Sequence, residues 1–365
     1  MINSIQIQNY RCYQDTTIKG FKRVNLIGGF NNSGKTVLLE AILLNTSPTG
    51  QNISMLKQLR GESMSSKDLP EYAWDNFFFN QNKENKIKIN SIFNKNKHLC
   101  LMIDVDNITT AFVDNVEGED ENLQMMLNDF VSNEKMIKSV LHLKYTNNKD
   151  VDALTIVAHS KGFTVKELKI PAAFNANYIP ASSKRKPAIL ARDYGIAEKR
   201  NQDYLILKAL QIIDANIEKI KVSVIGGNHI EIKRKGEDFM SSALFGDAIN
   251  KILNIILSIV NNKGEILLID EIENGIHYTV QKDFWKFIFE LANLEQFDNQ
   301  IFATTHSLEM IKAFAEVIKN DYPSDGAYFE LYLRKQTGKI DYNLHDLETF
   351  IYELSNNLPL RGESL

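Results

Sequence analysis

Residues 29–36 read GFNNSGKT, and this short stretch decides the fold of the 365-residue chain. Its glycines, lysine and threonine have the spacing G-x-x-x-x-G-K-[ST] that is typical of a phosphate-binding loop. The apolar segment from Arg23 to Gly28 predicts a buried strand before the loop, and the segment from Lys35 to Leu44 predicts a helix after it. Because a phosphate-binding loop joins a strand to a helix, these two neighbours favour a phosphate-binding loop over a glycine-rich turn that binds no ligand.

The residue types in the loop fit the chemistry of a nucleoside triphosphate. Gly29 and Gly34 let the backbone curl so that its N–H groups can point at phosphate oxygens. The N-terminus of the following helix adds partial positive charge. Lys35 would neutralise the β- and γ-phosphates, and Thr36 would offer its hydroxyl to Mg²⁺.

A second motif, EILLIDE at residues 265–271, is an apolar strand that ends in two acids. In doubly wound sheets the carboxyl end of a buried parallel strand lies beside the phosphate loop. Asp270 could hold Mg²⁺ through water, and Glu271 could polarise the attacking water. The alternative is a strand end that merely reaches solvent. Because 235 residues separate Lys35 from Asp270, an insertion must leave the core and return to it.

The ends of the chain have an α/β pattern and the middle has the period of two that is typical of strands. We expect a single head over residues 1–365, with an α/β fold and a mixed, largely parallel core sheet. Its expected parts are a nucleotide-binding core (1–50 and 240–365), an antiparallel β lobe (85–170) and an inserted helical and hairpin segment (171–239). Within these parts we predict helices at Asn122 to Lys138, Tyr194 to Ile213 and Phe245 to Val260, and a hairpin around Gly226 and Gly227. The aromatic cluster from Trp74 to Phe79 is expected in the core of the lobe.

The composition excludes several classes of protein. Hydrophobic residues make up 44% and charged residues 24%, which is typical of a globular chain. A net charge of −4 argues against a general nucleic-acid coat. Two cysteines, Cys12 and Cys100, cannot form a disulfide framework or a Cys₄ zinc site. Residues 1–11 lack the apolar core of a signal peptide, and Ile249 to Val260 is shorter than the ~20 residues of a membrane span. We expect a cytoplasmic protein that has no membrane partner.

Four ordered motifs resemble those of ABC-type ATPase heads of the SMC and RecF kind. They are most similar to the overcoming-lysogenization-defect (OLD) group of ATPases found in phage defence. The matching stretches are IQIQNYR at 5–11, NNSGKT at 31–36, LIDEIENGIH at 268–277 and ATTHS at 303–307. The resemblance implies an ABC-type head that binds and hydrolyses ATP with Mg²⁺.

The resemblance also implies a role for individual residues. Arg11 and Asn32 would line the phosphates, and Asp270 would serve Mg²⁺. Glu271 would be the general base and His306 would sense the γ-phosphate. His277 would pack in the loop that follows the two acids. The residues expected to contact the nucleotide are Arg11, Gly29, Asn31, Asn32, Ser33, Gly34, Lys35, Thr36, Val37, Ser241, Ser242 and Gly246.

The signature segment departs from the family pattern. Residues 241–247 read SSALFGD, which resembles the group's SSLGDG with one extra residue, and Ala248 stands where a glycine is expected. In ABC heads this segment contacts the γ-phosphate that the opposite subunit holds. A hydroxyl and a glycine before a helix still make a good anion site. The open alternative for Ser242 is a simple helix cap.

The resemblance implies a homodimer or higher homo-oligomer in which ATP bridges the subunits. The 59 residues after His306 are too few for the TOPRIM nuclease domain of OLD proteins. The dimer would therefore gate a separate effector, a nuclease or toxin of bacterial anti-phage defence. Two other readings are a RecF-like repair ATPase that contacts DNA directly and a nucleotide-bound scaffold with negligible turnover. The basic runs 184–186 and 233–235 are either solvated or in contact with phosphates or an acidic partner.

Overall fold

The computed structural model describes residues 1–62, 70–94, 97–108, 138–147, 150–159, 162–167, 175–182 and 185–356. Its contacts divide the chain into two compact units. The first unit comprises Met1–Asn3, Lys19–Leu39 and Phe174–Leu365, and the second comprises Ser4–Ile18 and Glu40–Ala173. Among the described residues, every helix is too short or too polar to cross a bilayer.

The first unit is built on a six-stranded sheet with the order β16-β15-β3-β14-β13-β9. Its five strands from β15 to β9 run parallel, and β16 pairs antiparallel with β15. The predicted α/β fold with a mixed, mostly parallel sheet is therefore confirmed. In chain order the strands are β3 (Val24–Gly29), β9 (Ala176–Ile179), β13 (Ile266–Ile269), β14 (Gln300–Thr304), β15 (Gly326–Leu333) and β16 (Ile340–His345).

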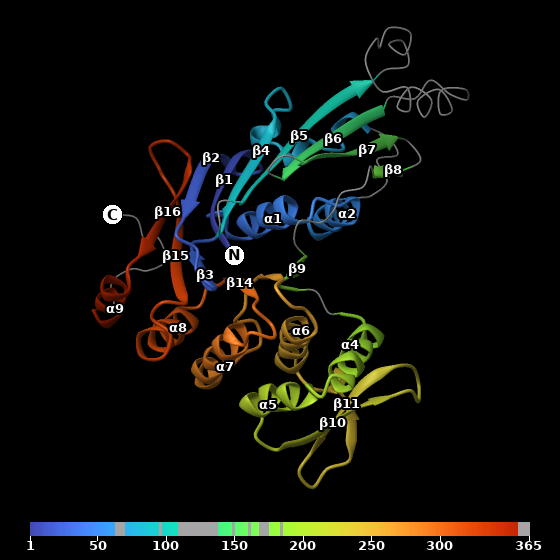
Figure 1. Cartoon of the computed structure of the whole chain (residues 1–365), viewed down its shortest axis with the longest axis vertical. Helices are drawn as coiled ribbons and strands as arrows, with labels where there is room; N and C mark the ends of the chain where they lie inside the picture. The colour runs from blue at the N-terminus through green and yellow to red at the C-terminus, as the bar shows by residue number, and fades with distance from the viewer. Residues whose placement is uncertain are drawn as a thin grey trace. The chain divides into compact units, whose positions relative to one another are not determined.

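Helices cover one face of this sheet (Figure 1). Leu26, Ile269 and Ala303 point from three adjacent strands into a buried cluster that includes the fully buried Trp285. The opposite face carries Phe302 and other aromatic rings. The helices of the first unit that follow β9 in the chain are α4 (Pro187–Lys199), α5 (Asp203–Ile213), α6 (Asp247–Asn261), α7 (Gln281–Asn293), α8 (Leu308–Asn320) and α9 (Leu347–Ser355).

Two predicted helices differ from the structure. The helix predicted from Tyr194 to Ile213 is wrong, because α4 ends at Lys199 and α5 begins at Asp203. Asn201 adopts a left-handed conformation (φ 55°), and the next residue's N–H donates to the Ala197 carbonyl at 2.9 Å. This is a Schellman ending, in which Asn replaces the usual glycine. The helix predicted from Phe245 begins instead at Asp247, since Phe245 is extended (ψ 150°).

A three-stranded antiparallel sheet lies between α5 and α6 in the sequence. Its strands are β10 (Ile217–Ser223), β11 (His229–Arg234) and β12 (Phe239–Ser241). Gly226 (φ 77°) and Gly227 (φ 105°) lie in the β10–β11 turn, so the predicted hairpin is confirmed. The third strand leads directly into the signature segment.

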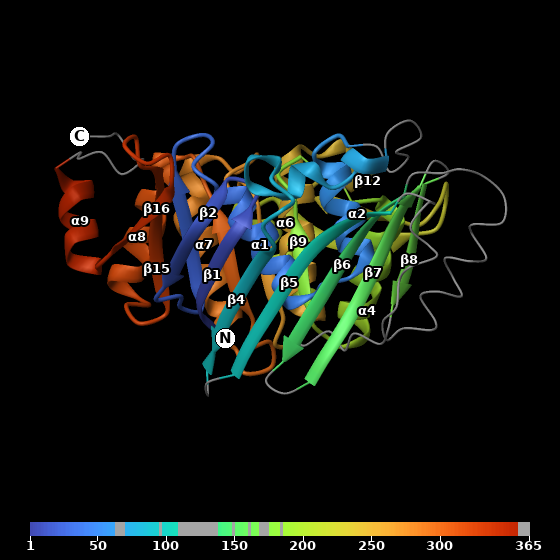
Figure 2. The same ribbon diagram turned by 90° about the horizontal axis from the view of Figure 1, so that it is seen from above.

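The second unit contains a seven-stranded sheet with the order β2-β1-β4-β5-β6-β7-β8, seen from above in Figure 2. Strands β1 and β2 belong to this sheet together with the strands of the predicted lobe. The structure differs here from the expectation, which placed all of residues 1–50 in the nucleotide-binding core. Trp74, Phe77 and Phe78 are buried in this unit, as predicted for the aromatic cluster. The strands are β1 (Ile2–Tyr10), β2 (Tyr13–Lys19), β4 (Ile87–Phe93), β5 (Lys97–Ile108), β6 (Lys138–Asn147), β7 (Asp150–His159) and β8 (Gly162–Glu167).

Two helices lie wholly or partly in the second unit. Helix α1 (Lys35–Thr46) begins in the first unit and ends in the second, and α2 (Gly50–Leu59) follows it. The side chain of Thr49 caps α2 by accepting the N–H of Asn52. The helix predicted from Asn122 lies outside the described residues, except that Lys138 begins β6.

Candidate functional site

The phosphate loop connects β3 to α1 in the conformation that its motif requires. Gly29 (φ 130°), Asn32 (φ 63°) and Gly34 (φ 90°) all lie in the left-handed region. A Cβ at Gly29 would lie 2.2 Å from the Leu331 carbonyl oxygen on the neighbouring strand β15. Position 29 therefore excludes a side chain both by its backbone angle and by its lack of space.

The ammonium of Lys35 folds back over the loop. Its Nζ donates to the Gly29 carbonyl at 2.8 Å and to the Phe30 carbonyl at 2.6 Å, and the residue is 5% exposed. Burial lowers the pKa of Lys35 to about 8, although the carboxylates of Asp270, Glu273 and Glu271 oppose this shift. A phosphate group would supply the countercharge that the two carbonyls provide only in part.

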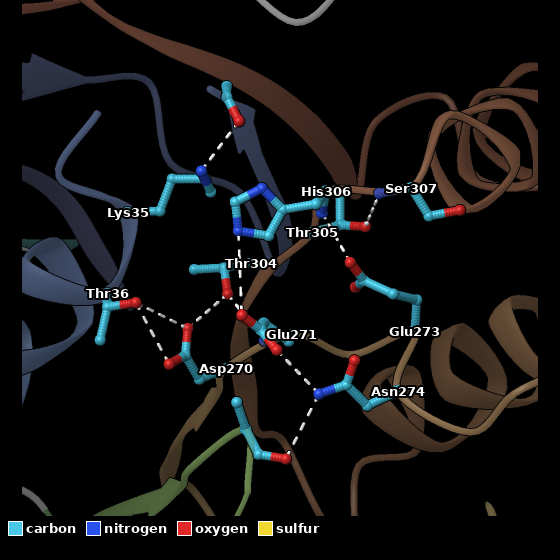
Figure 3. A network of polar contacts seen from close by, with 12 residues as sticks. Lys35, Thr36, Asp270, Glu271, Glu273, Asn274, Thr304, Thr305, His306 and Ser307 are labelled. Carbon is cyan, nitrogen blue, oxygen red and sulfur yellow. Dashed lines mark hydrogen bonds and ion pairs between the residues drawn. The ribbon is translucent and has the colours of Figure 1, made fainter. Parts of the chain in front are cut away.

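Asp270 at the end of β13 meets the loop through a hydroxyl (Figure 3). Thr36 Oγ1 donates to Asp270 Oδ1 at 3.1 Å, and Thr304 Oγ1 donates to the same oxygen at 2.6 Å. A hydroxyl facing a carboxylate fits Mg²⁺, which prefers oxygen ligands and keeps several waters or phosphate oxygens. Among the described residues no cluster of three His, Cys, Asp or Glu could hold a metal alone. Thr36 and Asp270 supply oxygen atoms of the kind that Mg²⁺ prefers as ligands.

The carboxylate of Glu271 is held from one side and open on the other. Asn274 Nδ2 donates to its Oε2 at 2.8 Å, and its Oε1 lies 3.9 Å from Nε2 of His306. The side chain is 37% exposed, so water can reach it. Its backbone is left-handed (φ 47°), which is unusual for a residue other than glycine. The arrangement suits a base that acts on water.

His306 follows β14 and lies between Lys35 and the acids in the same close view (Figure 3). Its backbone N–H donates to Glu273 Oε1 at 2.6 Å. Burial and the nearby Lys35 charge lower its pKa below 6.5, while Glu273, Glu271 and Asp270 oppose that shift. The imidazole is therefore neutral at neutral pH and can donate one hydrogen bond and accept another.

The other predicted loop residues lie around this cluster in different ways. Asn31 and Asn32 are exposed, whereas Ser33 and Val37 are buried. The Ser33 hydroxyl oxygen is buried without a hydrogen-bond partner among the described residues. Arg11 belongs to the second unit, where its Nε pairs with Glu40 Oε2 at 2.6 Å.

The signature segment lies at the start of α6. The side chain of Ser241 caps a short 3₁₀ helix, Ser242–Leu244, and Ser242 is itself 5% exposed. Gly246 is the N-cap of α6, and Leu244 before it is 76% exposed. The surface at this helix start is therefore formed by Ala243, Leu244, Gly246 and Asp247 more than by the hydroxyl of Ser242.

Several residues of the cluster were not assigned from sequence. Thr304 bonds both the side chain of Asp270 and the backbone of Glu271. Glu273, Asn274 and Lys251 also contact the two acids or the histidine. Thr304 ends an apolar strand, but a single threonine there does not carry the signal of two consecutive acids that pointed to Asp270. His277, expected to pack after the acids, contacts Thr279, and its ring is tilted by 38° against that of Tyr278 with ring centroids 4.4 Å apart.

Comparisons with known proteins found a matching family and one similar curated protein. Residues 24–312 match the family described as "AAA domain, putative AbiEii toxin, Type IV TA system". A curated relative, the ATP/GTP phosphatase of Helicobacter pylori (strain ATCC 700392 / 26695), is 26% identical over 347 residues, which cover 87% of this chain and 89% of the relative.

Two solved structures have a similar fold. One is an SMC head bound to the C-winged helix domain of ScpA, with 13% identity, a TM-score of 0.50 and coverage of 96% of this chain and 99% of that chain. The other is an Smc head with an extended coiled coil, bound to the C-terminal domain of ScpA derived from Pyrococcus furiosus. It shows 11% identity, a TM-score of 0.50 and coverage of 98% of this chain and 99% of that chain. The chain thus has the fold of an SMC-type P-loop head.

Proposed function

The chain belongs to the family of AAA domains described as putative AbiEii toxin, Type IV TA system, and is a P-loop ATPase; we propose that it hydrolyses ATP between two copies of itself. The observation that carries this proposal is the contact between Thr36 and Asp270, with Glu271 next in the chain. It joins the loop that would bind the triphosphate to the acid that would hold Mg²⁺, and the next residue, Glu271, would activate water. The relative's name, ATP/GTP phosphatase, supports the same chemistry.

Binding of the triphosphate would begin at the loop. Backbone N–H groups of residues 29–36 and of the start of α1 would donate hydrogen bonds to the phosphate oxygens. Lys35 would leave the Gly29 and Phe30 carbonyls and pair with the β- and γ-phosphates. A bound Mg²⁺ would neutralise developing charge on the phosphates, and Thr36 and Asp270 would hold it.

Hydrolysis would depend on the two groups beside Asp270. Glu271 would accept a proton from the attacking water, with its carboxylate oriented by Asn274. His306, neutral at neutral pH, would donate a hydrogen bond to the γ-phosphate. Both groups already lie within 4 Å of one another, so little rearrangement is needed.

The second copy would supply the start of its α6. Leu244 is 76% exposed and Gly246 is also exposed, so the segment is free to approach another subunit. The positive end of α6 would then meet the γ-phosphate that the first copy holds. ATP would bridge the two copies, and hydrolysis would release them.

The purpose of this cycle would be control of a separate effector, a nuclease or toxin of bacterial anti-phage defence, as in OLD-like systems. The family description, which names a putative toxin of a Type IV TA system, supports such a setting. The two SMC heads of similar fold are each bound to a domain of ScpA, which supports binding of a separate protein by such a head.

The test is Glu271→Gln, which keeps the shape of the side chain and removes its basicity. Turnover should fall by ~10²-fold or more, the order expected for loss of a positioned catalytic group. ATP binding should persist, and dimers should accumulate with ATP in analytical ultracentrifugation. Glu290→Gln on α7, where an exposed glutamate pairs with Lys208, is the matched control.

The outcomes separate the competing functions. Unchanged turnover in Glu271→Gln would refute the assignment of the base. Wild-type hydrolysis that DNA stimulates, and that salt suppresses steeply, would favour direct DNA binding. Negligible wild-type turnover, with and without the product of the neighbouring gene, would favour a nucleotide-bound scaffold.

A further inference from the structure

Lys251 on α6 reaches the strand end that carries the two acids. Its Nζ donates to the backbone carbonyl of Asp270 at 2.8 Å and lies 3.4 Å from the carbonyl oxygen of Pro180. These carbonyls lie at the ends of two neighbouring parallel strands, β13 and β9. A partly buried ammonium loses hydration, and burial lowers the pKa of Lys251. None of the hydrolytic steps above uses this cation.

The contact fixes one end of the peptide group between the two acids. The carbonyl oxygen of this peptide, from Asp270, accepts from Lys251 at 2.8 Å. Its N–H, from Glu271, donates to Thr304 Oγ1 at 2.8 Å. Because both polar atoms of the peptide are held, its plane cannot rotate freely. The direction in which each acid's side chain leaves the backbone is thereby set.

Glu271 needs such restraint more than most residues. Its left-handed backbone (φ 47°) brings Cβ close to the following carbonyl, so an unrestrained chain would avoid this conformation. Strained backbone persists where the surroundings over-determine it. Lys251 and Thr304 are the groups that hold this peptide.

Helix α6 is itself fixed against the segment that follows Glu271. A Cβ at Gly275 would lie 2.8 Å from the backbone nitrogen of Ala248, in the first turn of α6. The neighbouring Asn274 holds the Glu271 carboxylate at 2.8 Å. The lysine therefore extends from a helix whose first turn lies directly against this loop.

We propose that Lys251 is a positioning residue, which holds the Asp270–Glu271 peptide from α6 and so keeps the Glu271 carboxylate aimed at the attacking water. This inference rests on the proposed function, since it gives Glu271 the role of base. Lys251 acts through Glu271 and has no direct part in binding the nucleotide.

The test compares Lys251→Met, which removes the charge at similar length, with Lys251→Arg, which keeps it. In Lys251→Met kcat should fall by about tenfold or more, while the Kd for ATP stays within about twofold. Lys251→Arg should recover most of the lost kcat. Lys282→Met, at an exposed lysine of α7 paired with Glu316, is the control and should behave as wild type. Thermal unfolding of each variant shows whether it is folded.

The double variant Lys251→Met/Glu271→Gln distinguishes positioning from general damage. If Lys251 acts through Glu271, the double variant should be no slower than Glu271→Gln alone. An unchanged kcat in Lys251→Met, or a double variant slowed by the product of the two single effects, would overturn the inference. Failure of the proposed function would look different, since Glu271→Gln would then hydrolyse ATP like wild type.

Discussion

The hydroxyl of Thr36 lies 3.1 Å from a carboxylate oxygen of Asp270, although 234 positions separate them in the sequence. Thr36 is in the first turn of α1, and Asp270 directly follows β13. Parallel pairing of β3 with β14 and of β14 with β13 brings the ends of these strands to one edge of the sheet. The order of the strands in the sheet therefore brings Thr36 and Asp270 into contact.

The first prediction concerns the metal that this pair would hold. Asp270→Asn keeps the shape of the side chain but removes its charge, so the Mg²⁺ concentration for half-maximal hydrolysis should rise about tenfold or more. Thr36→Ala should act in the same direction, and Thr36→Ser, which keeps the hydroxyl, should not. Hydrolysis measured across a Mg²⁺ titration provides the values. A half-maximal concentration unchanged in Asp270→Asn would exclude Asp270 as a ligand.

The second prediction concerns the tight backbone of Gly29. Alanine there would place a Cβ 2.2 Å from the Leu331 carbonyl oxygen at a φ of 130°. We expect Gly29→Ala to destabilise the protein by about 2–4 kcal/mol through clash and backbone strain, and to abolish nucleotide binding. Urea unfolding and a nucleotide-binding assay measure the two effects.

Gly226→Ala is the matched control for this prediction. Gly226 is also left-handed (φ 77°), but among the described residues beyond its two chain neighbours no heavy atom lies within 4 Å of its added Cβ. Gly226→Ala should lower the free energy of unfolding by only about 1 kcal/mol, because the backbone angle is its one source of strain. Equal losses in the two variants would show that the contact with β15 is unimportant.

The sequence predicts those parts of the site whose residues are adjacent to one another in the chain. The loop from Gly29 to Thr36 and the strand that ends in Asp270 carry their own pattern of residue types. Thr304 has no such pattern, because a threonine at a strand end acquires meaning only when the neighbouring strand brings Asp270 to it. Lys251 lies in an apolar helical stretch, where a single lysine more often reaches solvent.

The fold shows the same division between local and distant information. The strand before the phosphate loop, the helix after it and the strand before Asp270 follow from local periodicity, so the sequence predicts them. β1 belongs to the seven-stranded sheet because it pairs with a strand that is distant in the sequence. The residues of β1 itself do not indicate which strand that is. The break at Asn201 was missed because asparagine tolerates both helical and left-handed backbone, and only the glycine form of this ending is readily seen.

The third prediction concerns a buried charge cluster in the second unit. Glu40 is 1% exposed and accepts from Arg11 Nε at 2.6 Å and from Arg60 at 2.7 Å. Tyr10 also donates to it, at 3.3 Å. Glu40→Ala would leave the buried Arg11 without its countercharge, so we expect a loss of about 3–5 kcal/mol in the free energy of unfolding.

Arg60→Ala is the comparison, because this arginine is 38% exposed and its removal leaves the Arg11–Glu40 pair in place. Arg60→Ala should lower the free energy of unfolding by about 1 kcal/mol or less. Urea unfolding of both variants measures the difference. If Glu40→Ala cost no more than Arg60→Ala, the buried pair would contribute little to stability.

The last prediction uses the shifted pKa of Lys35. Burial lowers its pKa from 10.5 to about 8, so between these values the unfolded chain holds a proton that the folded chain has released. Stability rises with pH wherever the unfolded state binds more protons. The buried ammonium therefore destabilises the nucleotide-free protein below pH 8, and this penalty fades as the pH rises above 8.

Lys35→Met removes the titrating group together with the hydrogen bonds to Gly29 and Phe30. The lost hydrogen bonds shift its stability by an amount that does not depend on pH. The free energy of unfolding of Lys35→Met, minus that of wild type, should therefore fall by about 1–2 kcal/mol between pH 7.5 and 9.5. Urea unfolding at intervals across that range, with Lys312→Met on the exposed side of α8 as control, measures it. A difference that stays constant with pH, or rises, would show that Lys35 keeps an ordinary pKa in the folded protein.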